Sequence, residues 1–313
     1  MNMKKWIIGF LVIACLAAGS IYIFIPSTIV VSEVRKIKTF RAAVAKLLTS
    51  KEKISLCFEK VATKKDSVFS YKGFDFTVSK IIFNGTLINI SSADLNVSSN
   101  LIPLELSRDS SSLYWVATFK TGANPFTRLK EYYTAKKLKA GMSGLLDGMQ
   151  TYLEHPMNTY GIEVKEIQLT DSLLISTRTT SNGEPGVAAI YSQIKKLEDY
   201  ARSQNAAATN SPMLNIQKID AMHFEFMVGL PINKAIAETG DILIKKMPYK
   251  GNMLITEIKG GPGAIKNGLT QMDSYRTDSK RTSPAIPFEL LITNRVTEPD
   301  TSKWVTRLYY PVM

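Results

Sequence analysis

Cysteine and histidine are both scarce in this chain. Its 313 residues include two cysteines, Cys15 and Cys57, and two histidines, His155 and His223. Cys15 lies inside an apolar run, so the rest of the chain has no internal disulfide to hold it together. Neither histidine has a cysteine or a second histidine at the spacing of metal ligands. The sequence therefore predicts no disulfide framework, no metal site and no cofactor.

Signatures of nucleotide chemistry are missing as well. The stretch GGPGAIKNG, residues 260–268, has Lys266 where a dinucleotide-binding glycine would be needed, and there is no Walker lysine pattern. The stretch GMSG, residues 141–144, lacks the second glycine of a nucleophile elbow. No segment is typical of a helix-turn-helix, and no motif that recognises nucleic acid accompanies the positive charge. We expect no nucleic-acid partner.

The positive charge is concentrated in the first half of the chain. The formal net charge is +12, and residues 1–156 carry 21 basic against 11 acidic side chains. Residues 157–313 carry 18 against 16. This asymmetry indicates two units with different surfaces, and a basic face suits proximity to anionic lipid.

The chain opens with a membrane-spanning pattern. Residues 6–25 contain no charged side chain and are followed by Pro26, a run long enough to cross a hydrocarbon core of about 30 Å. Residues 12–15 are similar to a weak lipoprotein cleavage box, but the chain stays apolar beyond Cys15. We predict a single-pass anchor over residues 1–26. Basic residues flank the run on both sides, so sidedness is open; we take the C-terminal bulk to be extracytoplasmic.

Residues 27–156 predict a strand, a short helix, several antiparallel strands and one long helix. Asn84-Gly85 is a hairpin signal between two strand-like runs, and Asn124-Pro125 is a helix start. The long helix has an apolar stripe. Its members are Phe126, Leu129, Tyr133, Leu138, Met142, Leu145, Leu146 and Met149. The element order, with NPFTRL before the last helix, resembles the SRPBCC (START-like, polyketide cyclase-like) superfamily. That resemblance implies a curved sheet gripping the helix, with a cavity between them.

Residues 157–313 contain an internal repeat. IEVKEIQLTDSLLISTRTT predicts a strand pair, residues 186–205 a helix, and two further strands follow. Residues 241–312 repeat the order strand, helix, strand, strand. Two copies imply a pseudo-two-fold arrangement with a groove where they meet. The predicted fold class of the whole chain is α+β.

The end of the chain carries a second resemblance. PFE at residues 287–289, EPDTSKWVT at 298–306, the strand RLYYPV and the earlier strand FEFMVGLPI are similar to the GyrI-like, or AraC-type, effector-binding domain. This resemblance covers about residues 157–313. It implies two repeats flanking a cleft, with Glu289 as the acid that faces lipophilic, often cationic, ligands. Gly261-Pro262-Gly263-Ala264 departs from the family, which commonly has an aromatic residue after the proline.

These patterns lead to one functional hypothesis and its rivals. We expect a membrane-anchored small-molecule-binding protein, acting as a sensor, carrier or sequestering module. Its ligand is lipophilic, neutral or cationic, and a cationic one would be held by a charge and by cation–π contacts. The candidate ligand-binding residues are Glu289, Phe224, Phe226, Tyr275, Trp304 and Tyr309. No residue is assigned a catalytic role.

Three alternatives stay open at the level of the sequence. Glu289 could instead form a structural ion pair with Arg295, Arg307 or Lys303. The same acid could serve a hydrolase, which would need a second polar group such as the hydroxyl of Tyr275 or Tyr309. Both units could also be interaction surfaces without a ligand.

Overall fold

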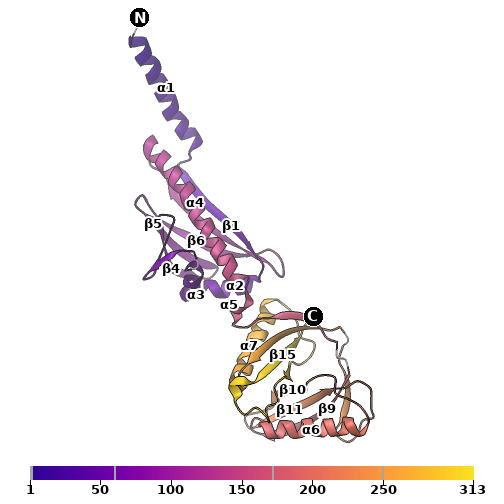
Figure 1. Ribbon diagram of the computed structural model, residues 1–313. Helices are drawn as coiled ribbons and strands as arrows, with labels where there is room; N and C mark the ends of the chain where they lie inside the picture. Colours follow the sequence, from indigo (N-terminus) through magenta and orange to yellow (C-terminus); the bar gives the residue numbers. More distant parts are fainter. Residues whose placement is uncertain (1–2, 60, 171–172, 249) are drawn as a thin grey trace. The chain divides into compact units, whose positions relative to one another are not determined.

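The computed structural model describes residues 3–59, 61–170, 173–248 and 250–313. The chain divides into two compact units, Met1–His155 and Pro156–Met313. Figure 1 shows the elements of each unit. The first unit begins with α1 (Met3–Phe24), which is long and apolar enough, over Trp6–Phe24, to cross a membrane.

A seven-stranded antiparallel sheet forms the body of the first unit. Its strand order is β1-β7-β6-β5-β4-β3-β2. The strands are β1 (Thr28–Ile37), β2 (Thr63–Lys65), β3 (Val68–Tyr71), β4 (Phe74–Ile82), β5 (Gly85–Ser92), β6 (Leu95–Glu105) and β7 (Ser111–Lys120). The helices that follow α1 are α2 (Arg41–Leu48), α3 (Lys51–Phe58) and α4 (Pro125–Leu153). Strands β2 to β7 pair in chain order, each with the next. Strand β1 pairs with β7 and forms one edge of the sheet.

Local signals place several of these elements where the sequence predicts them. The β4–β5 hairpin turns at Phe83-Asn84, one residue before the predicted Asn84-Gly85, because Gly85 already pairs with Ile82. Gly85 has φ +156°, and a Cβ there would clash with the Leu101 carbonyl oxygen of β6. Asn124 Oδ1 accepts a hydrogen bond from the Phe126 N–H at 2.9 Å and so caps α4. Helix α3 was not predicted from the sequence. Its signal was Ser50, whose Oγ accepts from the Lys53 N–H at 3.3 Å.

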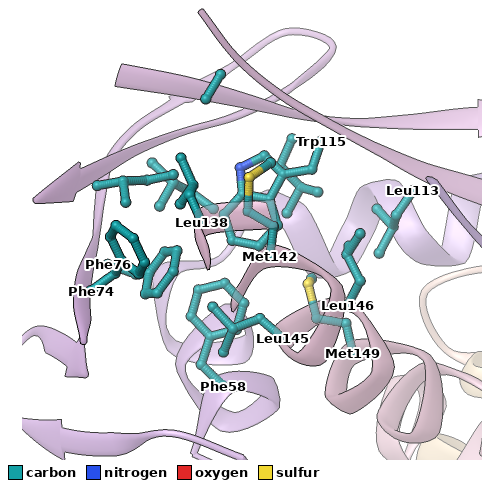
Figure 2. Packing of buried hydrophobic residues seen from close by; sticks show 14 of the residues in the cluster. Phe58, Phe74, Phe76, Leu113, Trp115, Leu138, Met142, Leu145, Leu146 and Met149 are labelled. Atoms are coloured by element: carbon teal, nitrogen blue, oxygen red, sulfur yellow. The ribbon is translucent and has the colours of Figure 1, made fainter. Parts of the chain in front are cut away.

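The interior between this sheet and α4 is filled by side chains. Trp115 of β7, Phe58 of α3 and Leu145 of α4 are fully buried and lie close together in Figure 2. The Phe58 and Trp115 rings stack with centroids 6.1 Å apart. Trp115 Nε1 donates to Ser99 Oγ at 2.9 Å, which satisfies its polar edge inside the core. The predicted stripe is buried only from Leu138 onward. Phe126, Leu129 and Tyr133, in the first turns of α4, are exposed.

The second unit is built on an eight-stranded antiparallel sheet. Its order is β12-β9-β11-β10-β14-β15-β13-β8. The strands are β8 (Lys165–Gln168), β9 (Leu173–Asn182), β10 (Met213–Lys218), β11 (His223–Pro231), β12 (Leu243–Lys246), β13 (Asn252–Lys259), β14 (Phe288–Leu291) and β15 (Val305–Pro311). The helices are α5 (Pro156–Tyr160), α6 (Val187–Ser203), α7 (Pro262–Asp278) and the 3₁₀ turn η1 (Thr301–Lys303).

The strand order is symmetric about the β10–β14 seam. On one side lie β10, β11 and β9, with α6 between β9 and β10 in sequence; on the other lie β14, β15 and β13, with α7 between β13 and β14. The edge strands are exchanged between the halves, because β8 pairs with β13 and β12 pairs with β9. The prediction that β8 and β9 form a strand pair is therefore wrong. Short edge strands contain too little pattern to specify a distant partner.

Candidate functional site

A cavity of about 510 Å³ lies in the second unit where the two halves meet. Its walls come from the start of α6, the first turns of α7, β10 and the beginning of β14. The lining residues include Pro185, Val187, Ile190, Leu214, Ile216, Lys218, Phe224, Ile265, Leu269, Glu289, Arg295 and Trp304. Its size falls within the range of about 300–1,000 Å³ that is usual for small-molecule sites.

Close helix packing sets the shape of this cavity. Gly268 of α7 has no side chain, and a Cβ there would meet Ile258 and Leu308 side-chain atoms at 2.9 Å. The helix can therefore lie directly on β13 and β15. On the other half, Ile190 and Ile194 of α6 are buried in a cluster with Leu214. The two helices are held against their own halves of the sheet, and the cavity lies over the seam.

Glu289 is the acid at the floor of the cavity. It is the second residue of β14 and pairs with Leu214 of β10 and Leu308 of β15. Alternation along the strand places its side chain on the same face as these two partners. The residue is 8 % exposed. A carboxylate this deeply buried needs a charged or hydrogen-bonding partner.

The protein supplies that partner as Arg295. Arg295 Nη2 donates to Glu289 Oε2 at 2.8 Å and to Thr306 Oγ1 at 3.0 Å. The two charged side chains are 7 % and 11 % exposed. Of the three basic residues considered from the sequence, Arg295 is the one that pairs. Arg307 instead pairs with Glu257 at 3.1 Å. The nearest acid to Lys303 is Asp300, at 3.7 Å, since Glu298 lies 4.0 Å away.

Two aromatic residues fix the position of Arg295. Its guanidinium carbon lies 4.8 Å from the centre of the Trp304 ring, within cation–π range. Its backbone N–H donates to the Tyr191 hydroxyl oxygen at 2.8 Å, and that hydroxyl donates to the Thr293 carbonyl at 3.3 Å. Tyr191 belongs to α6, so the segment after β14 is tied to the helix on the opposite half. Tyr191 and Thr306 were not predicted, because nothing local in the sequence marks them.

Only one oxygen of the Glu289 carboxylate is held by the protein. Among the described residues, Oε2 accepts from Arg295, and Oε1 accepts from none. Burial raises the pKa of the Glu289 carboxyl, the Arg295 guanidinium offsets part of that rise, and Glu184 adds to it. Lys218 and Lys266 also line the cavity, and so does a second acid, Glu184. Glu184 is exposed, so Glu289 is the buried acid of the cavity.

Three of the six predicted ligand-binding residues line this cavity. These are Glu289, Phe224 and Trp304. Phe226 lies in the core cluster beneath α6. The Tyr275 ring packs edge-to-face on Tyr160, with centroids 5.2 Å apart. Tyr309 stacks on Phe288 at 4.9 Å.

A second polar group of the kind a hydrolase would use does not contact Glu289 within the described residues. The charged partner of the acid is Arg295, and neither tyrosine considered for that role lines the cavity. The described residues also hold no group of three His, Cys, Asp or Glu that could bind a metal ion. The arrangement can bind a polar or charged group against an apolar wall.

No protein-family model matches the sequence, and neither does a curated protein. Among solved structures, the EcmrR–DNA complex has 14 % identity and a TM-score of 0.42, with 60 % of this chain and 71 % of that chain covered. The EcmrR C-terminal domain has 15 % identity and a TM-score of 0.39, with 49 % and 98 % covered. SAV2435 bound to tetraphenylphosphonium has 16 % identity and a TM-score of 0.35, with 49 % and 94 % covered. None of the three TM-scores reaches 0.5, so a functional assignment depends on the geometry of the chain itself.

Proposed function

We propose that the second unit is a small-molecule-binding domain of the GyrI-like type, and that the cavity between α6 and α7 is its ligand site. One observation carries this proposal. A buried carboxylate, Glu289, has one oxygen held by Arg295 and leaves the other without a donor among the described residues, on the floor of a cavity of about 510 Å³. A ligand that donates a hydrogen bond, or carries a positive charge, completes that group.

The ligand class follows from the walls. Ile190, Leu214 and Ile265 provide apolar surface. Phe224 and Trp304 also line the cavity, with Lys218 over the first ring and Arg295 over the second. Such walls favour a lipophilic molecule with a single polar or cationic centre. Arg295 offsets the charge of Glu289, and Lys218 and Lys266 also line the cavity, so attraction of a cation to Glu289 is short-ranged. The exposed Glu184 is a second acid on the cavity wall. A soft, delocalised cation suits this site, because little hydration is lost when it enters an apolar cavity.

The remaining parts of the chain complete the proposed architecture. We propose that α1 anchors the protein in a membrane, with the soluble units on the extracytoplasmic side. We also propose that the first unit is an SRPBCC-like domain, supported by its β1-β7-β6-β5-β4-β3-β2 order and its C-terminal α4. The filled space between that sheet and α4 supports assigning ligand binding to the second unit. The absence of a nucleic-acid partner remains a prediction.

Binding of a lipophilic cation to the full chain tests this function. The protein would be labelled with 5-fluorotryptophan, placed in lipid nanodiscs and titrated with tetraphenylphosphonium, the compound in the SAV2435 structure. Trp304 lines the cavity, so its ¹⁹F resonance should shift saturably. Tetraphenylphosphonium has no hydrogen-bond donor, so Glu289→Gln removes an electrostatic attraction alone and should weaken binding by about tenfold.

Glu257→Gln provides the matched control. Glu257 is an exposed acid of the same sheet, paired with Arg307, and does not line the cavity. The affinity of the Glu257→Gln variant for tetraphenylphosphonium should equal that of the native chain. No saturable shift at Trp304, or equal weakening by both substitutions, would contradict the proposed site.

A further inference from the structure

The sheet of the second unit has a second cavity, on the face opposite Glu289. Its volume is about 540 Å³. The side chains of Met213 and Met227 face it from β10 and β11, where Met213 pairs with Gly229 and Met227 pairs with Asn215. Leu214 and Phe226, one residue away on each strand, point to the helix-covered face. The two cavities therefore lie back to back on one sheet.

The walls of this second cavity are apolar and adaptable. Methionines at positions 213, 227, 247 and 253 line it, together with Phe288 and Ile286. Methionine side chains are flexible and polarisable, so surfaces rich in them accommodate apolar chains of varied shape. The cavity is large enough for a small ligand, and it shares Leu214, Asn215 and Phe288 with the Glu289 cavity.

The charged side chains of this cavity are all basic. Lys245, Lys246 and Lys250 line it, and no acidic side chain does so. Lys245 is partly buried, and the contact of its ammonium is with a thioether: Nζ lies 2.9 Å from Met227 Sδ. Sulfur is a weak acceptor. Within the described residues, neither Lys245 nor Lys246 forms an ion pair.

The nearby acid does not neutralise Lys245. Glu225 is the carboxylate close enough to act on it, and Glu225 is paired with Arg178 at 3.2 Å. Arg178 in turn repels the Lys245 ammonium. Burial lowers the pKa of Lys245, with Arg178 adding to the effect and Glu225 opposing it. An anionic group beside Lys245 Nζ would neutralise the charge of this ammonium.

We propose that this methionine-lined cavity binds an anionic amphiphile, a molecule with one negatively charged head and an apolar tail, with the head on Lys245 and the tail along Met213 and Met227. Charge complementarity selects this occupant. A cationic amphiphile would place its charge against three lysines, and a neutral one would leave Lys245 unpaired. The site is separate from the proposed Glu289 site and takes a ligand of opposite charge.

Methionine-methyl NMR of the full chain in lipid nanodiscs tests this inference. The chain has 12 methionines, and Met→Leu variants would assign the resonances of Met213 and Met227. The probes are octanoate, octanol and octyltrimethylammonium, which share one chain length and differ in head charge. Octanoate should shift both resonances saturably, and it should bind at least about tenfold more tightly than octanol.

Three variants separate charge from packing. Lys245→Met should weaken octanoate binding by about tenfold and bring it to the affinity of octanol, while Lys245→Arg keeps the charge and should keep the affinity. Lys234→Met removes an exposed lysine that does not line the cavity and should change nothing. Glu257→Gln, at an exposed acid that lines neither cavity, should also leave octanoate binding unchanged.

Each contrary result overturns the inference. If no probe shifts Met213 and Met227 saturably, there is no ligand site on this face. If octanoate and octanol bind equally and Lys245→Met has no effect, the cavity takes apolar chains without regard to charge. If Lys245→Arg loses binding while the protein keeps its methyl spectrum, the ammonium charge is not what holds the head.

Discussion

Arg295 Nη2 lies 2.8 Å from Glu289 Oε2, and both side chains are almost completely buried. The acid at the second position of the buried strand β14 has its counter-charge six residues further along the chain. This pair combines the structural and the ligand-binding interpretations of Glu289. One oxygen has a structural role, and the other faces the cavity side of the sheet without a donor among the described residues.

Removing Arg295 should destabilise the second unit strongly. Arg295→Met leaves a buried carboxylate without its partner, a change that typically costs about 3–5 kcal/mol. Denaturant unfolding of 5-fluorotryptophan protein, followed at the Trp304 resonance, would measure the loss. Arg307→Met removes an exposed pair with Glu257 and should cost no more than about 1 kcal/mol.

The double variant Glu289→Leu/Arg295→Met supplies the second half of this test. Replacing both members of a buried pair by apolar side chains is often close to neutral. Its stability should return to near that of the native chain. A double variant as unstable as Arg295→Met alone would mean that the lost packing of Arg295 on Trp304, and not the bare carboxylate, caused the damage.

Binding of a lipophilic cation should depend on pH through Glu289. Burial raises the pKa of this carboxyl above its ordinary value, with Arg295 opposing the rise. The carboxylate that attracts a cation is present above that raised pKa and is lost as the pH falls through it. Tetraphenylphosphonium carries a permanent charge. Its affinity should therefore begin to fall at a higher pH than it would if Glu289 had the pKa of an ordinary glutamate.

Through Glu289, folding stability depends on pH with the opposite sign to cation affinity. A raised folded-state pKa means that protonation of Glu289 stabilises the fold below the unfolded-state pKa, and that this contribution is lost as the pH rises through the folded-state pKa. The affinity for tetraphenylphosphonium and the free energy of unfolding would each be measured from pH 4 to 8, for the native chain and for Glu289→Gln. A pH profile of cation affinity that is identical in the two proteins would assign the dependence to another group.

Much of the local structure could be predicted because it depends on local rules. Asn84-Gly85 predicts the β4–β5 hairpin to within one residue, since its turn is Phe83-Asn84, and Asn124 caps α4 through its own side chain. The repeat in the second unit follows from alternating strand and helix periodicity. Glu289 was identified as the acid of interest by resemblance, and its burial agrees with its apolar neighbours.

The parts that could not be predicted depend on distant partners. The exchange of β8 and β12 between halves is decided by the whole sheet, since each edge strand is four residues long. Phe226 and Phe224 have the same strand parity, yet only Phe224 lines the cavity, because α6 covers Phe226. Tyr309 is on the opposite face of the sheet, stacked on Phe288. The contact between Tyr191 and Arg295 spans 104 residues and leaves no local trace in the sequence.

The filled core of the first unit should be sensitive to loss of volume. Leu145 of α4 is fully buried among Phe58 and Trp115, and Leu145→Ala should lower the free energy of unfolding by about 2–5 kcal/mol. The ¹⁹F resonance of Trp115 would follow this unit during denaturation. Leu106→Ala makes the same chemical change at a side chain that is 55 % exposed and should cost less than about 0.5 kcal/mol. Equal costs would contradict the close packing seen around α4.

Membrane association should depend on the apolar character of α1. Leu11 and Leu16 lie within the span Trp6–Phe24, and each arginine placed near the centre of a spanning helix costs about 2.5–3.5 kcal/mol of insertion free energy. The double variant Leu11→Arg/Leu16→Arg should move the chain from the carbonate-resistant membrane fraction to the soluble fraction. Leu104→Arg/Leu106→Arg adds the same two charges at exposed positions of the first unit, where they need no burial. That control should stay in the membrane fraction, because general basicity does not release an inserted helix. A native chain that carbonate extracts, or a double α1 variant that remains membrane-bound, would show that α1 is not the anchor.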